Sequence, residues 1–510
     1  MATVPRPAPT VAVGRTTATR HATPTAGAAP TRGRSTARAA ASPSAAPAAA
    51  ASDAADCNPL PVDLPAAATL RASTKKVFAY YFPPFPVSVD NAAPASDSYS
   101  RWQYSHNSQG GAYDLRDRPI GRNPLSGNWK QTDFETEVRR AIMVGIDGFI
   151  FEYHDSGDAR WNQLPAMLAA AKAVDPGFRI MLGPDFPLGA GASTDPVVDI
   201  VSRYANDPSV YKLDDGRVVL APFYAERQPA TWWQTVQDGL AAKGVPTALV
   251  PIFLSWGGGT EHADWDSHVY GYSSWGNRWV SGTATYARDS QAAHARGKIW
   301  MQPAAFEDTR AYDGRYWEAG NSGLLRASMQ TAIDSDADWV AFITWNDYTE
   351  SWVSPSAERG HAVLDVASYF IDRFTTGGVP TVARDALYYF HRSQRTDAPF
   401  SAKPVGRNGQ PVTMAIAAGD PATNNVELLA FLTAPGTLTI TQGSTVQTKD
   451  ASAGMTSFTV PMVAGTTPRF SLSRNASTVA SVTSSTPIAA SVTYQDMMYH
   501  AGGSLTCTRP

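Results

Sequence analysis

Residues 339–344 read Trp-Val-Ala-Phe-Ile-Thr, a short apolar run that is followed at once by the acidic segment 345–350, Trp-Asn-Asp-Tyr-Thr-Glu. A run of this length that contains β-branched and aromatic residues is typical of a strand buried on both faces. Helical periodicity precedes it at residues 324–334 and follows it at residues 361–374. A strand set between two helices is the repeating unit of a parallel β/α sheet.

Seven further apolar runs of strand length precede this one. They are residues 77–82, 148–153, 179–182, 218–223, 248–254, 268–272 and 298–301. Amphipathic helical patterns lie between several of them, at residues 134–144, 164–173, 197–204 and 232–242. Eight strands that alternate with helices predict a (β/α)8 barrel, the TIM barrel of the α/β class, over residues 70–395.

The two ends of the chain differ in composition from the predicted barrel. Residues 400–510 contain short alternations rich in Thr, Val and Ser, such as 437–440 and 457–460, separated by Gly, Asp, Asn and Pro. We interpret this region as an antiparallel β-sandwich accessory domain. It contains no Trp, so a role in stabilising the barrel is favoured over one as a carbohydrate-binding module. Residues 1–56 are rich in Ala, Pro, Thr and Arg and contain no aromatic residue, which predicts a disordered leader.

The bulk composition favours a neutral binding partner. The 510 residues carry a formal net charge of −3, which provides no positive field for nucleic acid or for an anionic membrane surface. The 14 Trp and 20 Tyr are numerous, and aromatic rings stack well on sugars. The sequence has no run of about 18 apolar residues that would span a membrane. We therefore expect a monomer that acts on a neutral polysaccharide without a cofactor.

The cysteines and the leader bear on export. Cys57 and Cys507 stand at opposite ends of the predicted folded region. A disulfide between them would tie these ends together and would need an oxidising compartment, whereas two unpaired thiols are the alternative. Arg15 and Arg20 interrupt the one stretch that could serve as a signal peptide. We expect an extracellular protein whose export route the leader does not reveal.

Acidic residues stand where several predicted strands end. Asp347 and Glu350 follow the eighth strand, Asp185 follows the third, and the second ends in Glu152 and His154. In a (β/α)8 barrel the carboxyl ends of all strands meet at the face that carries the active site. Hydrolysis of a glycosidic bond needs one protonated and one ionised carboxyl group, and crowding of two acids separates their pKa values in this way. We therefore take Asp347, Glu350 and Asp185 as candidate catalytic residues, the alternative for each being a loop salt bridge or a helix cap.

Other side chains at this face are candidates for binding the sugar. They are Tyr80, Glu152, His154, Trp256, Trp345, Asn346 and Tyr348. The aromatic members can stack on sugar rings, although core packing explains each of them equally well when it is taken alone. The 9 His are scattered, and no second His lies at ligand spacing from His154, so we predict no metal site.

The segment from Ile343 to Ser351 resembles a motif of glycoside hydrolase family 71, the α-1,3-glucanases or mutanases. The family reads Thr-Trp-Asn-Asp-Tyr-Gly-Glu-Ser there, and this chain differs only where Thr replaces Gly. The resemblance covers residues 76–392. It includes residues 76–80, 141–149, 184–186 and 386–392. It implies an inverting endo-hydrolase of α-1,3-glucan, with Asp347 and Glu350 as the essential pair and Asp185 as a third acid.

Two departures from the family pattern fall at substrate-facing positions. Thr349 replaces the Gly of the motif, and residues 151–154 bring the carboxylate of Glu152 into a stretch that is neutral in the family. Two other interpretations therefore stay open. One is a barrel hydrolase of another α-glycan, such as an α-mannoside, and the other is a non-catalytic glycan-binding protein of the cell surface. The second is disfavoured because a binding site does not need three acids crowded at one face. The sequence does not assign the acid and the base.

Overall fold

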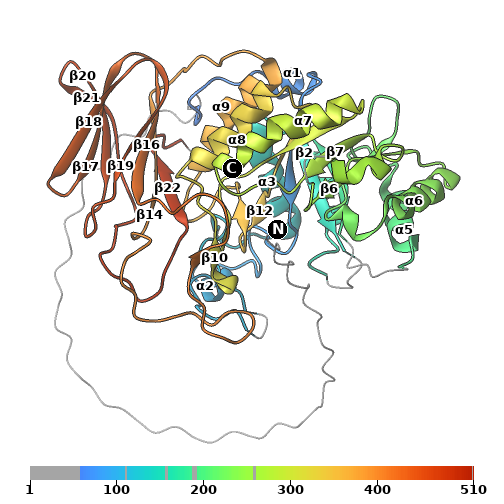
Figure 1. The fold of residues 1–510 in the computed structure, drawn as a ribbon, viewed down its shortest axis with the longest axis horizontal. Helices are drawn as coiled ribbons and strands as arrows, with labels where there is room; N and C mark the ends of the chain where they lie inside the picture. The colour runs from blue at the N-terminus through green and yellow to red at the C-terminus, as the bar shows by residue number, and fades with distance from the viewer. Residues whose placement is uncertain (1–57, 110–111, 155–158, 186–191, 257–259, 508) are drawn as a thin grey trace, which may run out of the picture. The chain divides into compact units, whose positions relative to one another are not determined.

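The structure is a computed structural model that describes residues 58–109, 112–154, 159–185, 192–256, 260–507 and 509–510 (Figure 1). Residues 57–510 form one compact unit. The expected leader, residues 1–56, lies outside the described residues, and so does Cys57. The disordered leader and the disulfide between Cys57 and Cys507 therefore stay predictions.

The centre of this unit is a curled parallel sheet with the strand order β5-β4-β3-β2-β1-β11-β8-β7-β6. Its strands are β1 (Lys76–Tyr81), β2 (Gly148–Tyr153), β3 (Arg179–Pro184), β4 (Val218–Leu220), β5 (Thr247–Leu249), β6 (Ile252–Phe253), β7 (Gly271–Ser274), β8 (Ile299–Ala304) and β11 (Trp339–Phe342). Each neighbouring pair is parallel. The predicted α/β class with a parallel sheet is confirmed.

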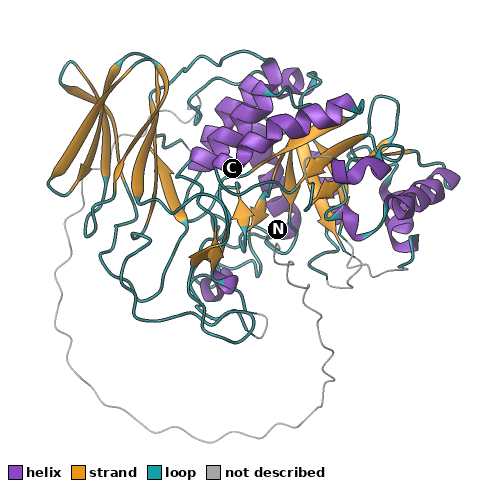
Figure 2. Cartoon of the chain, viewed as in Figure 1, coloured by secondary structure: helices purple, strands orange, loops and turns teal. Residues whose placement is uncertain are grey.

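Helices connect successive strands and cover the outer face of the sheet (Figure 2). The longer ones are α3 (Trp129–Met143), α4 (Leu164–Val174), α5 (Asp195–Tyr204), α6 (Ala230–Ala242), α7 (Tyr286–Ala295), α8 (Gly323–Asp334) and α9 (Ala362–Thr376). The short ones are α1 (Ala67–Arg71), α2 (Tyr99–Trp102), η1 (Ala225–Arg227), η2 (Thr260–Trp265), η3 (Ser281–Thr285) and η4 (Ala311–Asp313). The spacing of apolar residues explains their orientation. In α5, for example, Val197 and Val201 are buried on one face while Arg203 is exposed.

Side chains of the parallel strands alternate between two faces. Phe78 and Tyr80 of β1 belong to a buried cluster on the inner face, together with Ile150 of β2 and Met181 of β3. Val77, the neighbour of Phe78, belongs instead to the cluster that includes the helices. Positions two apart in a strand share a face. A residue just past a strand therefore faces the interior when it lies an even number of positions after an inward-facing residue of that strand. We call the inward-facing side chains and these continuations the inner row.

The two strands at the ends of the sheet order are consecutive in sequence. Only Val250 and Pro251 separate β5 from β6. This segment is bonded on both sides, since Val250 N donates to Leu220 O at 2.8 Å and Pro251 O accepts from Ser273 N at 3.0 Å. Pro251 has no N–H to donate to a ladder. The single strand expected over residues 248–254 is therefore split in two.

Antiparallel sheets form the C-terminal part of the chain. One has the order β19-β16-β14-β22 and the other has the order β18-β17-β20-β21. Their strands are β14 (Ala386–Arg392), β16 (Asn425–Leu432), β17 (Gly436–Gln442), β18 (Thr445–Ala451), β19 (Gly454–Pro461), β20 (Arg469–Arg474), β21 (Ser477–Thr483) and β22 (Tyr499–Gly503). One buried apolar cluster contains side chains from both sheets, and the rings of Tyr389 and Phe470 stack within it at 5.3 Å. The predicted antiparallel strands are confirmed.

Strand β14 belongs to a C-terminal sheet, although it lies within residues 70–395, the range expected for the barrel. It pairs with β16 on one side and with β22 on the other. Tyr388 and Phe390 pack in the large apolar cluster of the parallel sheet and its helices, whereas Leu387 and Tyr389 pack between the antiparallel sheets. The two faces of β14 therefore join the two parts of the unit.

Small sheets lie at the carboxyl end of the parallel strands. The hairpin of β12 (Asn346–Asp347) and β13 (Ser351–Trp352) follows β11 directly. A three-stranded sheet has the order β15-β10-β9, made of β15 (Ala415–Ile416), β10 (Arg315–Tyr316) and β9 (Thr309–Arg310). The acidic segment after the eighth predicted strand therefore lies in a hairpin rather than in an open loop.

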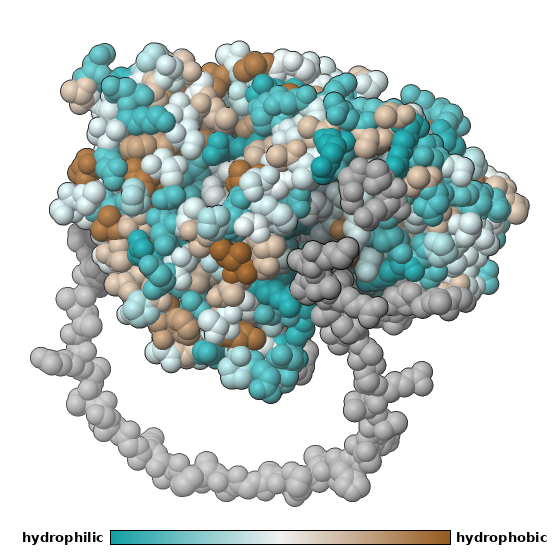
Figure 3. Space-filling model, viewed as in Figure 1, coloured by the Kyte–Doolittle hydropathy of each residue, from teal (hydrophilic) through white to brown (hydrophobic). Residues whose placement is uncertain are grey.

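The surface is mixed in polarity on the face drawn in Figure 3, where strongly apolar residues lie singly or in small groups among hydrophilic ones. Scattered apolar residues of this kind are normal and need no partner. Over the described ranges, no helix combines the length and the apolarity that a membrane crossing requires.

Candidate active site

Three of the expected site residues continue the inner row of the parallel sheet. Tyr80 of β1 is the register partner of Ile150, and Glu152 lies two positions beyond Ile150. Asp185 directly follows β3, four positions beyond the inner residue Met181. Tyr80, Glu152 and Asp185 are all buried. The alternation of the strands therefore directs their side chains to the same interior.

Glu152, His154 and Asp185 form one polar cluster. His154 Nε2 lies 3.0 Å from Glu152 Oε1 and 3.4 Å from Asp185 Oδ2. Burial alone would lower the pKa of His154, but its contacts with Asp185 and Glu152 outweigh burial and raise that pKa to about 9. Burial raises the pKa of Glu152 to about 7, against the hydrogen bond from His154, and the charge of Asp185 adds to the rise. At neutral pH a protonated imidazole therefore lies between two acids.

Neighbouring side chains hold this cluster in place. Arg227 Nη1 lies 3.2 Å from Asp185 Oδ1. Trp161 packs on His154, with ring centroids 3.9 Å apart. Burial and the two neighbouring carboxylates raise the pKa of Tyr80 well above its ordinary value. The Tyr80 phenol therefore keeps its proton beside the acids.

This cluster also has the composition of a cation site. Glu152, His154 and Asp185 each offer one ligand atom, and these atoms lie within 4.8 Å of one another. Carboxylate and imidazole are ligands of Zn²⁺ and Mn²⁺. The sequence predicted no metal site, since no second His lies at ligand spacing from His154, whereas this grouping uses acids from two strands. The raised pKa of His154 opposes metal binding, since only the neutral imidazole is a ligand.

The acidic segment after β11 is shaped by Thr344. Its Oγ1 donates to Ser351 O at 2.6 Å and accepts from Asp347 N at 2.8 Å. Asp347 is buried, and its Oδ1 accepts from the N and the Oγ1 of Thr349 at 3.0 and 2.5 Å. Burial raises the pKa of Asp347 well above its ordinary value, and the charge of Glu350 adds to the rise. Asp347 is therefore a carboxyl group that keeps its proton at a pH where an exposed Asp is ionised.

Glu350 is held by groups from the segment after β8. Tyr312 donates its hydroxyl to Glu350 Oε1 at 2.8 Å, and Arg310 Nη2 lies 2.9 Å from Oε2. Thr309 N donates to the backbone oxygen of Glu350 at 2.9 Å. Arg310 also pairs with Asp308 at 2.8 Å. Glu350 is therefore an ion-paired and partly exposed side chain beside the buried Asp347.

A line of contacts joins the His-containing cluster to the acidic hairpin. Trp275, just after β7, packs edge-on against Tyr80 with ring centroids 5.2 Å apart, and the guanidinium of Arg278 lies 5.7 Å from the Trp275 ring. Arg278 Nε lies 3.4 Å from Asp308 Oδ2, and Asp308 pairs with Arg310. The contacts thus run from the aromatic neighbour of the first cluster to the arginine of the hairpin. The two acid groups are therefore connected through side chains that follow β7 and β8.

Three of the aromatic residues expected at the site lie in the core. Trp345 is fully buried, and its Nε1 donates to Glu137 Oε1 at 3.1 Å. Tyr348 is 2% exposed, and its hydroxyl lies 2.8 Å from Ser354 Oγ. Trp256 is 5% exposed and packs in the apolar cluster between the sheet and the helices. In the structure these rings have no exposed face on which a sugar could stack.

Asn346 has a positioning role in the structure. Its side chain is fully buried, with Oδ1 accepting from Phe82 N at 2.8 Å. Its Nδ2 donates to Phe82 O at 3.0 Å and to Phe85 O at 2.9 Å. Asn346 therefore ties the segment that follows β1 to the acidic hairpin.

Sequence reasoning missed the groups that hold Glu350, namely Asp308, Arg310 and Tyr312. They follow β8, which extends to Ala304, whereas the expected strand stopped at Met301. The Gln and Pro that come next broke the apolar run without ending the strand. If the predicted strand had been extended to Ala304, Asp308, Arg310 and Tyr312 would have been placed just beyond its carboxyl end.

A comparison with family models supports the resemblance seen in the sequence. The model described as glycosyl hydrolase family 71 matches residues 125–502, which is more than half of the chain. The chain belongs to glycosyl hydrolase family 71. It is therefore a glycoside hydrolase, and the family 71 match includes the acidic hairpin and most of the C-terminal strands.

Named proteins are similar to this family 71 chain over most of their length. Glucan endo-1,3-alpha-glucosidase agn1 of Schizosaccharomyces pombe is 25% identical in an alignment of 383 residues that covers 69% of this chain and 86% of that protein. Mutanase Pc12g07500 of Penicillium rubens is 22% identical in an alignment of 380 residues that covers 69% of this chain and 81% of that protein. A solved structure of a GH99 endo-alpha-mannosidase from Bacteroides thetaiotaomicron covers 59% of this chain and 97% of its own, with 13% identity and a TM-score of 0.47. This structural likeness is too weak to support a shared mechanism.

Proposed function

We propose that this enzyme cleaves internal α-1,3-glucosidic bonds of a neutral glucan. The observation that supports the proposal most is the hairpin pair, in which buried Asp347 has a raised pKa beside the ion-paired carboxylate of Glu350. Glycoside hydrolysis needs a protonated and an ionised carboxyl group together. One relative is named a glucan endo-1,3-alpha-glucosidase and the other a mutanase, which favours the α-1,3 linkage.

In the proposed mechanism Asp347 is the general acid and Glu350 is the general base. Asp347 gives its proton to the glycosidic oxygen while the bond from that oxygen to the anomeric carbon breaks. Glu350 takes a proton from a water molecule that attacks the same carbon from the opposite face. The product then has the inverted configuration, as in enzymes whose carboxyl groups stand about 6.5–9.5 Å apart. Arg310 and Tyr312 keep the Glu350 carboxylate in position.

The His-containing cluster binds the sugar next to the scissile bond in this proposal. The carboxyl groups of Asp185 and Glu152 accept hydrogen bonds from sugar hydroxyls, and the imidazolium of His154 donates one. Tyr80 lies beside them in the same inner row. Asp185 is then the third acid of the site. It binds the sugar, and its negative charge stabilises the positive charge of the transition state.

The experiment that tests the proposed function is incubation with insoluble α-1,3-glucan, other α-glucans and α-mannan, followed by measurement of new reducing ends. We expect release from α-1,3-glucan, with oligosaccharides among the first products because cleavage is internal. Release from α-mannan alone would assign the enzyme to α-mannosides. Binding to a glycan with no release from any of these polymers would favour a non-catalytic glycan-binding protein.

The stereochemistry has its own test. A proton NMR time course of the first products should show the β-anomer appearing before mutarotation, because inversion changes the configuration of an α-linked sugar. An α-anomer as the first product would overturn the proposed roles of Asp347 and Glu350.

We propose that the parallel sheet is a closed eight-stranded (β/α) barrel when β5 and β6 are counted as one strand. Support comes from the hydrogen bonds of residues 249–252, which reach β4 on one side and β7 on the other. The antiparallel sheets, which share one apolar cluster, are proposed to form a β-sandwich. We place the boundary between the two domains in the connection from α9 to β14.

We also propose that the enzyme acts outside the cell as a monomer. An insoluble glucan does not cross a membrane, so its hydrolase must meet it in the extracellular space. Size-exclusion chromatography with light scattering tests the oligomeric state, and a dimer mass would contradict the expected monomer.

A further inference from the structure

A cavity of about 530 Å³ is lined by Tyr104, His106 and Arg116 together with residues between 485 and 500 near the C-terminus. Its lining includes neither the acidic hairpin nor the His-containing cluster. Cavities of this size are typical of sites for small molecules and sugar units. We propose that it is a second carbohydrate-binding site, which holds a chain of the α-glucan apart from the catalytic residues. This inference rests on the proposed function for the identity of the glucan.

An aromatic wall borders the cavity. Tyr104 is 37% exposed, and His106 stacks on Tyr494 with ring centroids 3.6 Å apart and planes at 12°. Tyr104 and His106 have φ angles of 53° and 55°, in the left-handed region that costs non-glycine residues energy and recurs at ligand sites. Burial and the charge of Arg116 lower the pKa of His106, so its ring is neutral. Flat and uncharged rings at a cavity wall suit the apolar face of a sugar ring.

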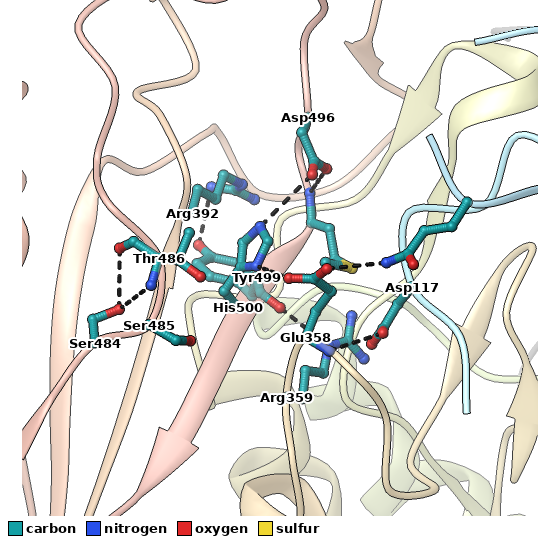
Figure 4. Close-up of polar contacts among 12 residues, drawn as sticks. Asp117, Glu358, Arg359, Arg392, Ser484, Ser485, Thr486, Asp496, Tyr499 and His500 are labelled. Carbon is teal, nitrogen blue, oxygen red and sulfur yellow. Dashed lines mark hydrogen bonds and ion pairs between the residues drawn. The ribbon is translucent and has the colours of Figure 1, made fainter. Parts of the chain in front are cut away.

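Charged groups of both signs line the cavity. Figure 4 shows the contacts of one of them, His500, with Glu358 and Asp496. His500 Nδ1 lies 3.1 Å from Glu358 Oε2, and its Nε2 lies 3.7 Å from Asp496 Oδ2. Burial alone would lower the pKa of His500, but these two acids raise it to about 9, so the imidazole is cationic. With Arg116 as the second cation, the lining carries two positive and two negative groups. Such a balance favours a polar ligand without net charge.

Buried donors at the cavity have no acceptor among the described residues. They are Gln394 Nε2 and the Nε and Nη2 of Arg116. Gln394 is 1% exposed and Arg116 is 3% exposed, so bulk water does not serve them freely. Buried donors in native proteins nearly always have partners. A polyhydroxylated ligand can donate to Glu358, whose side chain is 25% exposed.

The test measures binding to the insoluble α-1,3-glucan by depletion of the full chain from solution. The parent protein carries Asp347→Asn, so that it does not degrade the probe. Tyr104→Ala removes the exposed ring. Thr493→Trp fills the cavity with a large side chain at an exposed position of the lining. The substitution does not alter the backbone oxygen of residue 493, which accepts from Ala402 N at 2.8 Å. Val479→Ala is the control, since Val479 is 45% exposed on β21 and outside the lining.

We expect both cavity variants to raise the dissociation constant about tenfold, equivalent to about 1.4 kcal/mol, with the control equal to the parent. Melting temperatures equal to that of the parent show that the variants are folded. Equal binding by the parent and both cavity variants overturns the inference, and so does a parent that does not bind. Hydrolysis is measured separately on the chain with Asp347 intact. Weakened binding by the variants without any hydrolysis would refute the proposed function and keep the second site.

Discussion

Asp347 and Glu350 are the residues whose loss should abolish hydrolysis. Asp347→Asn removes the proton that is donated, and Glu350→Gln removes the base, so each should lower kcat by about 10²- to 10⁴-fold. The melting temperature should stay close to that of the wild type, because an amide keeps the shape of the carboxyl group. Asp199→Asn on α5 is the control, since its side chain is 61% exposed, and it should keep full kcat. Turnover retained in both hairpin variants would place the chemistry elsewhere.

Asp347 should also set the pH above which activity is lost. Its raised pKa keeps the donor protonated above the ordinary range of Asp, and activity is lost as the pH rises through that pKa. Arg310 opposes the rise, so Arg310→Gln should raise the pKa of Asp347 further and move the alkaline limb of kcat/KM to higher pH. Arg203→Gln on the exposed side of α5 should leave the limb in place. An alkaline limb that Arg310→Gln leaves in place or moves to lower pH would exclude Asp347 as the donor.

The grouping of two candidate acids could be predicted from sequence, because residues just past parallel strands share a face. This rule brings Glu152 and Asp185 together, and the structure shows them with His154 in one cluster. The same rule failed to separate stacking aromatics from core aromatics. Trp345 and Tyr348 alternate with site residues in sequence, but a hairpin turns their rings into the core. The direction of a side chain within a tight turn depends on tertiary contacts that a single sequence does not reveal.

At the scale of secondary structure, the pairing of β2 with β3 sets the position of the His-containing cluster. A Cβ added to Gly148 would collide with the backbone oxygen of Arg179, its partner across the ladder. Gly148→Ala should therefore force the strands apart, lower the free energy of unfolding by about 1–3 kcal/mol and reduce activity. Gly378→Ala is the control, because its new Cβ would meet its nearest neighbour at 3.8 Å. It should change neither the free energy of unfolding nor the activity. Denaturant unfolding measures the first effect, and wild-type stability of Gly148→Ala would contradict it.

The elements themselves were predictable to different degrees. Strands β1, β2 and β11 are buried on both faces, so their sequences are long apolar runs that predict strands clearly. Boundaries were less predictable where Pro or a polar residue falls inside a strand, as in β8 and between β5 and β6. The partner of β14 was beyond prediction, because all of its residues are buried and its sequence fits either sheet equally well.

At the scale of the whole molecule, buried ion pairs join the parallel-sheet part to the C-terminal sheets. Arg392 of β14 lies 3.1 Å from Glu318, and both side chains are at most 2% exposed. Arg392→Met leaves Glu318 buried without its cation and should lower the free energy of unfolding by about 3–5 kcal/mol. Arg395→Met removes an exposed pair nearby and should leave stability unchanged.

Calorimetry checks both of these effects and the number of transitions. We expect one heat-absorption peak, because residues 57–510 form one compact unit and β14 packs on both of its parts. Two well-separated peaks in the wild type would show that the parts unfold independently. The same scan would then locate the destabilisation by Arg392→Met in one peak.

Some of the groups that join the two parts lie near the C-terminus and are therefore synthesised last, which has a consequence for biosynthesis. Glu307 Oε2 accepts from Tyr499 N at 3.0 Å, and Arg392 Nε donates to Met497 O at 2.7 Å. A ribosome adds about 5–20 residues per second, so the parallel strands exist in the nascent chain for several seconds before residues 497–499 are made. During that time Glu307 and Arg392 are without these partners. A polypeptide released before Tyr499 would present unpaired charges and an open apolar edge to chaperones and proteases.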